Sequence, residues 1–133
     1  MPKSDEAITA YVNMWHHIWA CDVLSSMRHP VPRWVNIKDE EKALAIIREE
    51  APFPEQRIRE IIASSPLTTK ELLARTKRDQ PNPAYITWAH DWVSNELDEE
   101  IMYACRERRM QFGSMNPVFE QLFDSGAAKK IAY

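Results

Sequence analysis

The chain has 133 residues, of which 44% are hydrophobic, and it carries 17 lysines and arginines against 20 aspartates and glutamates. This length and apolar content suit one domain with its own core and exclude a disordered chain. The net charge of −3 argues against a protein that coats nucleic acid without specificity, so any nucleic-acid contact must come from a local basic face. With 2 glycines and 9 prolines, tight β-hairpins are disfavoured and an all-α fold is expected.

The sequence also indicates a compartment. No apolar run approaches the roughly 20 residues that a transmembrane helix needs, and the first residues do not form a secretion signal. Cys21 and Cys105 lie far apart and are expected to be buried thiols rather than a disulfide. We therefore expect a protein of the reducing cytoplasm, without a cofactor.

The N-terminal segment predicts a long amphipathic helix, which begins after the capping residue Ser4 and ends near Met27, before Pro30. Trp15 and Trp19 lie one turn apart on its apolar stripe. Two interpretations stay open for them: ordinary core packing, or a subunit interface, where tryptophan is enriched. The stripe has helical spacing and consists of Ile8, Tyr11, Val12, Trp15, Ile18, Trp19, Val23 and Met27.

The same helix carries two residues with metal-binding chemistry on one face, His17 and Cys21, with His16 and Asp22 beside them. A zinc site needs two further ligands, and no paired cysteine or histidine spacing supplies them. We therefore expect no metal here and interpret the pair as a buried thiol beside a surface histidine.

A proline-containing connector follows at residues 28–38, where extended backbone is expected. Asp39 then opens a second helix with acidic residues in its first turn, which ends near Glu50. The prolines within residues 51–54 break the chain again. We place the boundary of an N-terminal helical arm at this break, so that the arm spans residues 1–53.

Residues 54–112 carry the joints of a helix-turn-helix unit. Thr68 and Glu71 have the spacing of a capping box, in which the threonine caps a helix and the glutamate bonds back to it. Asn82 and Pro83 combine an N-cap residue with the proline that suits the first helical position. With the preceding helix as a brace, this order of short helices predicts the arrangement that many DNA-binding proteins use.

The second helix of this unit, near residues 68–77, carries a basic cluster that is expected to meet DNA phosphates, and a solvated helix face is the alternative interpretation. The candidate recognition helix, near residues 83–93, offers no Arg, Lys, Asn or Gln, and Asp91 would repel phosphate. Binding led by backbone contacts is therefore favoured over base readout. The candidate DNA-binding residues are Lys70, Arg75, Lys77, Arg78, Thr87 and His90.

A longer fourth helix is expected to begin near Glu96 and to end before Gly113, a residue that suits the position after a helix. Acidic residues fill its first turns and arginines lie toward its end, an order that the helix dipole favours. Its inward stripe consists of Leu97, Ile101, Ala104 and Cys105, with Tyr103 and Met110 beside it.

Residues 113–133 are expected to form a separate short helix and a tail. Asn116 and Pro117 repeat the pairing of an N-cap residue with a proline in the first turn, and Gly126 ends the helix. The residues after this glycine are expected to be mobile. They offer a partner two cations, Lys129 and Lys130.

The stretch from residue 54 to residue 112 resembles the helix-turn-helix region of the small terminase subunits of tailed bacteriophages. Pro83 and Thr87 stand at the positions of a Pro-x-x-x-Thr start, and Trp92 stands where the family has a tryptophan. Two features depart from the family: the step from Thr87 to Trp92 is one residue longer, and residues 79–81 replace the usual glycine of the turn. The following helix carries the matching groups Tyr103-Ala104 and Arg106-Glu107-Arg108.

The resemblance implies a non-enzymatic DNA-packaging protein of the host cell cytoplasm, which binds double-stranded viral DNA and delivers it to the large terminase subunit. It also implies a ring-shaped homo-oligomer, with the long fourth helix contributing to the contacts between subunits, and a C-terminal segment that meets the large subunit. The candidate interface residues are Trp15, Trp19, Tyr103 and Arg106, and the candidate contacts with the large subunit are Lys129 and Lys130.

Two other classes of function are weighed. A small helical regulator, or a phage-encoded inhibitor or adaptor that binds a protein target, fits the net negative charge and the acidic residues 96–100 better than a DNA-binding protein does. A small fixed stoichiometry and a protein target would distinguish it. An enzyme is not expected, because the sequence shows no nucleophile beside a base, no glycine-rich phosphate loop and no paired carboxylates of a recognisable type.

Overall fold

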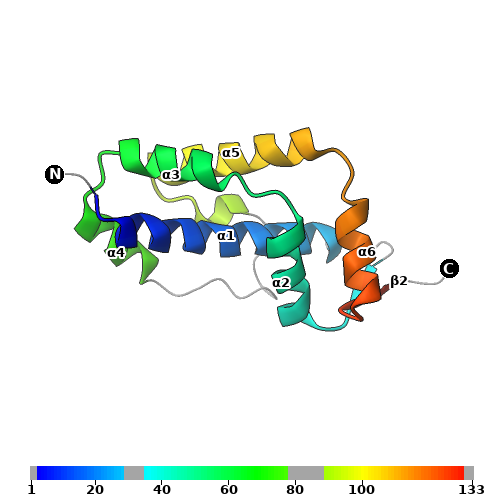
Figure 1. Cartoon of the computed structure of the whole chain (residues 1–133). Coiled ribbons are helices and arrows are strands. Elements are labelled where there is room, and N and C mark those ends of the chain that lie inside the picture. The colour runs from blue at the N-terminus through cyan, green and yellow to red at the C-terminus, as the bar shows by residue number, and fades with distance from the viewer. Residues whose placement is uncertain (1–2, 29–34, 78–88, 131–133) are drawn as a thin grey trace.

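The computed structural model describes residues 3–28, 35–77 and 89–130, and within these ranges the fold is mostly helical (Figure 1). The helical class agrees with the sequence-based expectation, to which a small two-stranded sheet is added. The elements are, in chain order, α1 (Asp5–Arg28), β1 (Val35–Ile37), α2 (Glu40–Glu50), α3 (Glu55–Ser64), α4 (Thr69–Thr76), the 3-10 helix η1 (Ala89–Trp92), α5 (Glu96–Phe112), α6 (Asn116–Asp124) and β2 (Ala128–Lys130).

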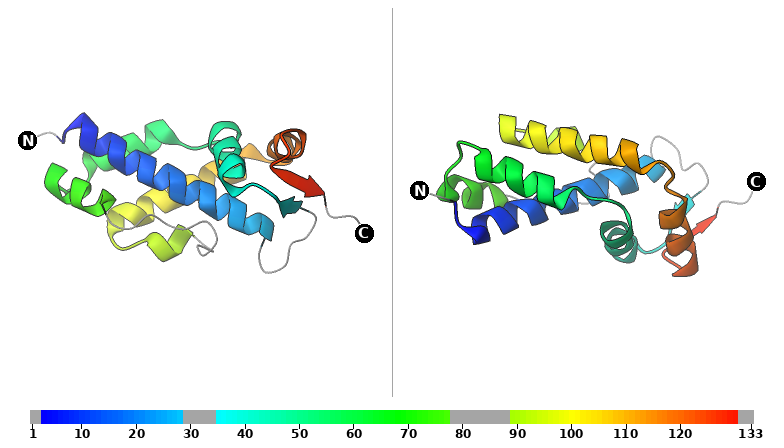
Figure 2. Two further views of the ribbon diagram at one scale, coloured as in Figure 1. Left: turned by 90° about the horizontal axis from the view of Figure 1, so that it is seen from below. Right: turned by 45° about the horizontal axis from the view of Figure 1, so that its top comes forward.

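Helix α1 is the central element of the fold, because other helices cover it along most of its length (Figure 1 and Figure 2). α2, α3, α4 and η1 all contact it. Its buried side chains lie on more than one face: besides most of the predicted stripe, Met14, Ala20 and Cys21 are also buried. A helix that is apolar nearly all round belongs in a core rather than on a surface.

The other helices are arranged around α1 in two groups. α3 and α5 lie side by side over it, while α2 and α6 pack together at one end, next to the sheet, and α4 lies toward the opposite end (Figure 2). One hydrophobic core joins these elements, with buried residues from all six helices and from both strands. The interior of the described chain is therefore continuous.

The described elements of the predicted arm, α1, β1 and α2, contribute to the same core as the helices that follow. The connector after α2 docks directly on α1: the ring of Phe53 stacks on His16, with 4.3 Å between the ring centroids, and lies 5.7 Å from the ring of Trp19. Phe53, the apolar residue between the two prolines of this connector, is thereby held against α1.

Local capping signals locate most of the helix starts. Ser4 and Asp39 each accept a hydrogen bond at 3.1 Å from the backbone N–H three residues further on, and the predicted capping box precedes α4. Gly113 follows α5 with a φ of 82°, a conformation that favours glycine. The start of α6 differs from the prediction, since Met115 rather than Asn116 precedes the helix and no side chain caps it.

Residues 128–130, which belong to the C-terminal segment predicted to be a mobile tail, form the second strand of the small sheet. β2 pairs with β1 in an antiparallel register that places Val35 opposite Lys130. The carbonyl of Ala127 also accepts hydrogen bonds from the backbone N–H groups of Lys38 and Asp39, at 2.8 and 3.1 Å. A short strand is possible within residues 28–38 from the sequence, but each strand has only 3 residues and neither is stable alone, so the sequence does not predict their pairing.

The candidate recognition helix lies mostly outside the described residues, as do Arg78 and Thr87. Its described end is the short 3-10 helix η1, and residues 93–95 after it are not helical. α3, α4 and η1 are thus the described parts of the three helices predicted for the helix-turn-helix unit.

α1 is the longest of the described helices. α1 has 24 residues, but neither it nor any other described helix combines the length and the apolar character needed to cross a bilayer.

Removing residues 127–133 tests how much the small sheet contributes to stability. The deletion uncovers Val35, which is 2% exposed, and leaves two backbone N–H groups before α2 without their acceptor. We expect the free energy of unfolding, measured by urea denaturation, to fall by about 2 kcal/mol. Removing residues 131–133 alone is the matched control. Equal stability of the two truncated proteins would contradict a stabilising role for β2.

Candidate nucleic-acid interface

Helix α4 presents a short basic stripe to solvent. Leu72 is fully buried and fixes which side of the helix faces the core. On the other side Lys70, Ala74 and Lys77 are all exposed, and their spacing of four and three residues places them on one face. The two lysines lie about 10 Å apart along the helix axis. Between them the small alanine leaves room for close approach by a large partner.

Arg75, the third predicted phosphate contact, points into the protein. Its guanidinium forms an ion pair with the carboxylate of Asp98 and donates a second hydrogen bond, at 2.9 Å, to the carbonyl of Trp92. The side chain is 17% exposed and that of Asp98 is fully buried. The charge of Arg75 is therefore already compensated inside the fold, and its guanidinium is not free on the surface to hold a phosphate.

Asp98 is the acceptor at the centre of a buried network. One carboxylate oxygen accepts hydrogen bonds from the hydroxyl of Tyr11 and, at 3.0 Å, from the indole N–H of Trp15. The other oxygen binds Arg75 and accepts from the backbone N–H of Ser94 at 3.1 Å and from its hydroxyl at 3.3 Å. Both oxygens are thus satisfied, as a buried charge requires.

The network explains the position of Asp98, one of the acidic residues in the first turns of α5. Asp98 precedes Ile101, Met102 and Cys105 by three, four and seven residues, and all three are buried. The position of Asp98 on the apolar stripe of a helix could have indicated that its carboxylate is buried. A buried carboxylate needs hydrogen-bond donors from elsewhere in the fold. The sequence does not indicate which donors these are.

The chemistry of the network is structural rather than catalytic. Burial, reinforced by the hydrogen bond to Asp98 and by its negative charge, raises the pKa of Tyr11 to about 12. The phenol therefore stays protonated at neutral pH and acts as a donor. The carboxylate of Asp98 already accepts several hydrogen bonds, so neither group is arranged as a base or a nucleophile for a substrate.

The remaining candidate residues fall into three groups. Trp15 and Trp19 are 0% and 2% exposed, so both belong to the core of the single chain, which is the first of the two interpretations. Tyr103, 56% exposed, and Arg106 lie on the outer side of α5, where another molecule can reach them. Arg78 and Thr87 lie outside the described residues, and so does the side chain of His90.

The two C-terminal lysines of the predicted partner site are exposed, but on a strand rather than on a mobile tail. Lys129 and Lys130 belong to β2, and the ammonium group of Lys130 lies 5.5 Å from the centre of the Phe123 ring. This distance is within the range of a cation–π contact. The sheet therefore fixes the backbone of both lysines against α6.

The histidine and cysteine of α1 lie together, as their spacing predicts. The Sγ of Cys21 is 3.7 Å from Nε2 of His17, and the thiol is buried. Within the described part of the chain, no group of three or more His, Cys, Asp or Glu side chains is placed to hold a metal ion.

Comparisons with known proteins add no relative. No family model, no curated protein and no solved structure matches this chain. Its function is therefore inferred from the surfaces and contacts described here.

Replacing Asp98 by Asn tests the buried network. The amide keeps the shape of the carboxylate, but it leaves the Arg75 charge uncompensated and turns a donor toward groups that already donate. Removing one partner of a buried ion pair costs about 3–5 kcal/mol, so we expect a fall of about that size in the free energy of unfolding. Glu99→Gln, an exposed neighbour, is the matched control and should change stability by less than about 0.5 kcal/mol. Equal stability of the two variants would refute the network.

The alkaline stability of the protein tests the environment of Tyr11. In the unfolded chain the phenol ionises at its ordinary pKa of 10.0, whereas the folded protein holds the proton until about pH 12. The stability that Tyr11 contributes is thus fully present below pH 10 and is lost as the pH rises toward 12. We expect the difference in unfolding free energy between wild type and Tyr11→Phe to narrow over this range, measured by urea denaturation. A constant difference would contradict the raised pKa.

Proposed function

We propose that the protein is a non-catalytic DNA-binding subunit of the small-terminase type, which binds double-stranded viral DNA and delivers it to a large terminase subunit. The observation that carries the proposal is the exposed stripe of Lys70, Ala74 and Lys77 on α4. Lysine ammonium groups bind phosphates without reading the bases, and the small alanine allows the helix to lie close to the DNA backbone.

Because Arg75 points into the protein, the DNA-binding surface proposed on α4 has only the two lysines as its cations. Instead of holding a phosphate, Arg75 ties α4 to α5 through Asp98, so the orientation of the two lysines is fixed by the core. Two lysines give few phosphate contacts for each subunit, and weak binding is expected from one copy. Several copies in a homo-oligomer multiply that affinity without any new contact.

The other surfaces of the proposed subunit can be assigned in the same way. Arg106 on α5 is exposed and is proposed to meet a neighbouring copy. Lys129 and Lys130 on β2 are proposed to meet the large subunit. Trp15 and Trp19 have no part in these contacts, because the core covers them.

A second function is favoured by the acidic surface of α5. Glu96, Glu99 and Glu100 are all exposed near the start of this helix. They would repel DNA and attract a basic protein surface, as expected for a small helical regulator, inhibitor or adaptor. The two functions differ in the surface that they use, so they can be tested separately.

Replacing Lys70 and Lys77 by Ala together tests the DNA-binding proposal. We expect weaker binding to a double-stranded DNA fragment, measured by fluorescence anisotropy at several salt concentrations. The slope of log affinity against log salt should flatten by about 2, because about one counterion is released for each phosphate contact. The helical circular dichroism should not change, since both side chains are exposed.

Lys38→Ala with Lys129→Ala is the matched control for this experiment. It removes the same charge from two exposed lysines beside the small sheet, far along the chain from α4. An equal loss of DNA affinity in both double variants would mean that binding depends only on the net charge of the protein. Unchanged DNA binding after the α4 substitutions would refute the role of this helix.

A further inference from the structure

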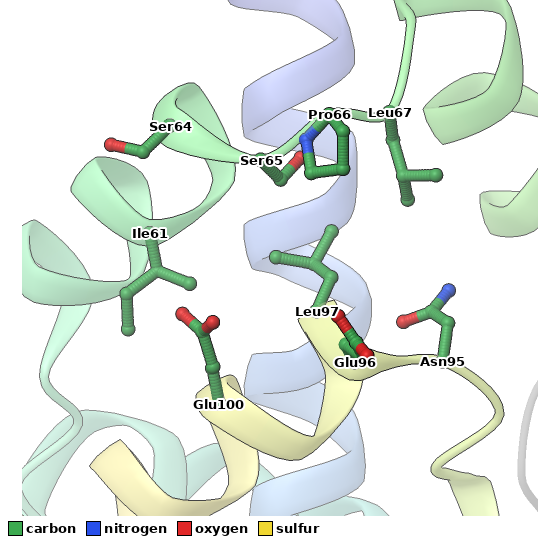
Figure 3. Close-up of a pocket in the computed structure, with 9 residues that line it drawn as sticks. All are labelled: Ile61, Ser64, Ser65, Pro66, Leu67, Asn95, Glu96, Leu97 and Glu100. Carbon is green, nitrogen blue, oxygen red and sulfur yellow. The ribbon is translucent and has the colours of Figure 1, made fainter.

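An apolar hollow lies between α3 and α5, apart from the lysine stripe of α4. It has a volume of about 370 Å³ and lies where the end of α3 and the loop after it face the start of α5 (Figure 3). Ile61, Pro66 and Leu67 line it from the α3 side, and Leu97 lines it from α5. Figure 3 shows these side chains converging from the two elements on one space.

The hollow continues along the same two helices. A second depression of about 260 Å³ shares Ile61 and Glu100 with the first and extends to Ala104 and Tyr103. The ring of Tyr103 is 56% exposed, so the far end of this groove offers a large apolar surface to solvent. Together the two depressions form an elongated site, here called the α3–α5 groove.

One edge of the α3–α5 groove is strongly acidic. Glu96, Glu100 and Glu107 all lie along α5 and line it, whereas Arg57 is the cation among its lining residues. Each of the three glutamates is exposed and forms no hydrogen bond or ion pair within the described chain. No side chain of the described chain therefore pairs with these carboxylates, and they are available to a partner.

We propose that the α3–α5 groove binds a basic amphipathic helix of a partner protein. The apolar face of such a helix fills the hollow at Ile61, Leu67 and Leu97, and lysines or arginines at its edge meet the carboxylates. Glu96 and Glu100 are one helical turn apart, so they match two cations that are also one turn apart on the partner. This is the helix-in-groove mode of recognition, with specificity set by charge.

A different protein suits this groove better than a second copy of the chain. The described chain offers two basic helix faces, and neither matches. On α4 the exposed lysines lie seven residues apart and Leu72 is buried behind them, and on α5 Glu107 separates Arg106 from Arg108. A second copy would bring this carboxylate toward an edge that is already acidic. The proposal does not rest on DNA binding, because it uses none of the α4 lysines.

The test uses the full chain and a labelled synthetic helical peptide with leucines on one face and two lysines one turn apart beside them. We expect the peptide to bind the wild-type protein, measured by fluorescence anisotropy. Glu96→Gln with Glu100→Gln should weaken binding about fivefold to tenfold, the loss expected for two exposed charge pairs. A peptide with glutamates in place of the lysines should bind the wild-type protein no more tightly than the basic peptide binds the double variant. Lys70→Ala with Lys77→Ala should leave peptide binding unchanged, which separates this test from that of DNA binding.

Glu49→Gln with Glu50→Gln is the matched control, because it removes the same charge from an exposed pair at the end of α2. If both double variants weaken peptide binding equally, the peptide responds only to the net charge of the protein, and the proposal is overturned. Failure of the basic peptide to bind the wild-type protein would also overturn it. Light scattering tests whether a second copy of the chain occupies the groove. A native mass that falls only in the α5 variant would assign the groove to a second copy.

Discussion

The ion pair between Arg75 and Asp98 is the constraint on which the rest of the structure depends. A carboxylate that is fully removed from water must gather donors, and here they come from α1, α4 and the segment before α5. These three parts can meet in few arrangements that satisfy both oxygens. The network therefore fixes how α4 and α5 sit on α1, which apolar packing alone would specify less sharply.

The orientation of α4 follows from this constraint and decides which of its cations can act. Arg75 and Lys77 are two residues apart and so point to different sides of the helix. Once Arg75 is drawn inward to Asp98, Lys77 and Lys70 must face solvent, and Leu72 completes the inner side. The described cations of the predicted basic cluster are thereby divided into one structural cation and two exposed ones.

The parts of the fold that could be predicted are those set by neighbouring residues. The start of α4 is encoded by Thr68 and Glu71, and the end of α5 by Gly113, because a cap needs partners only a few residues away. The partners of Asp98 could not be predicted in the same way. Tyr11 lies 87 residues away in the chain, and no local pattern shows that the two side chains meet. The pairing of β1 with β2 has the same distant origin.

A buried ion pair is weak evidence for stability, since well-packed apolar residues can do as well or better. Its contribution here is better sought in specificity. An apolar pair at positions 75 and 98 would tolerate small rotations of α4, whereas the guanidinium accepts few directions to the carboxylate and to the carbonyl of Trp92. The same fixed joint holds the start of α5, where Glu96 and Glu100 border the α3–α5 groove. The lysine stripe and the acidic groove edge are thus held by one buried carboxylate, which lets a chain of net charge −3 present two surfaces of opposite charge.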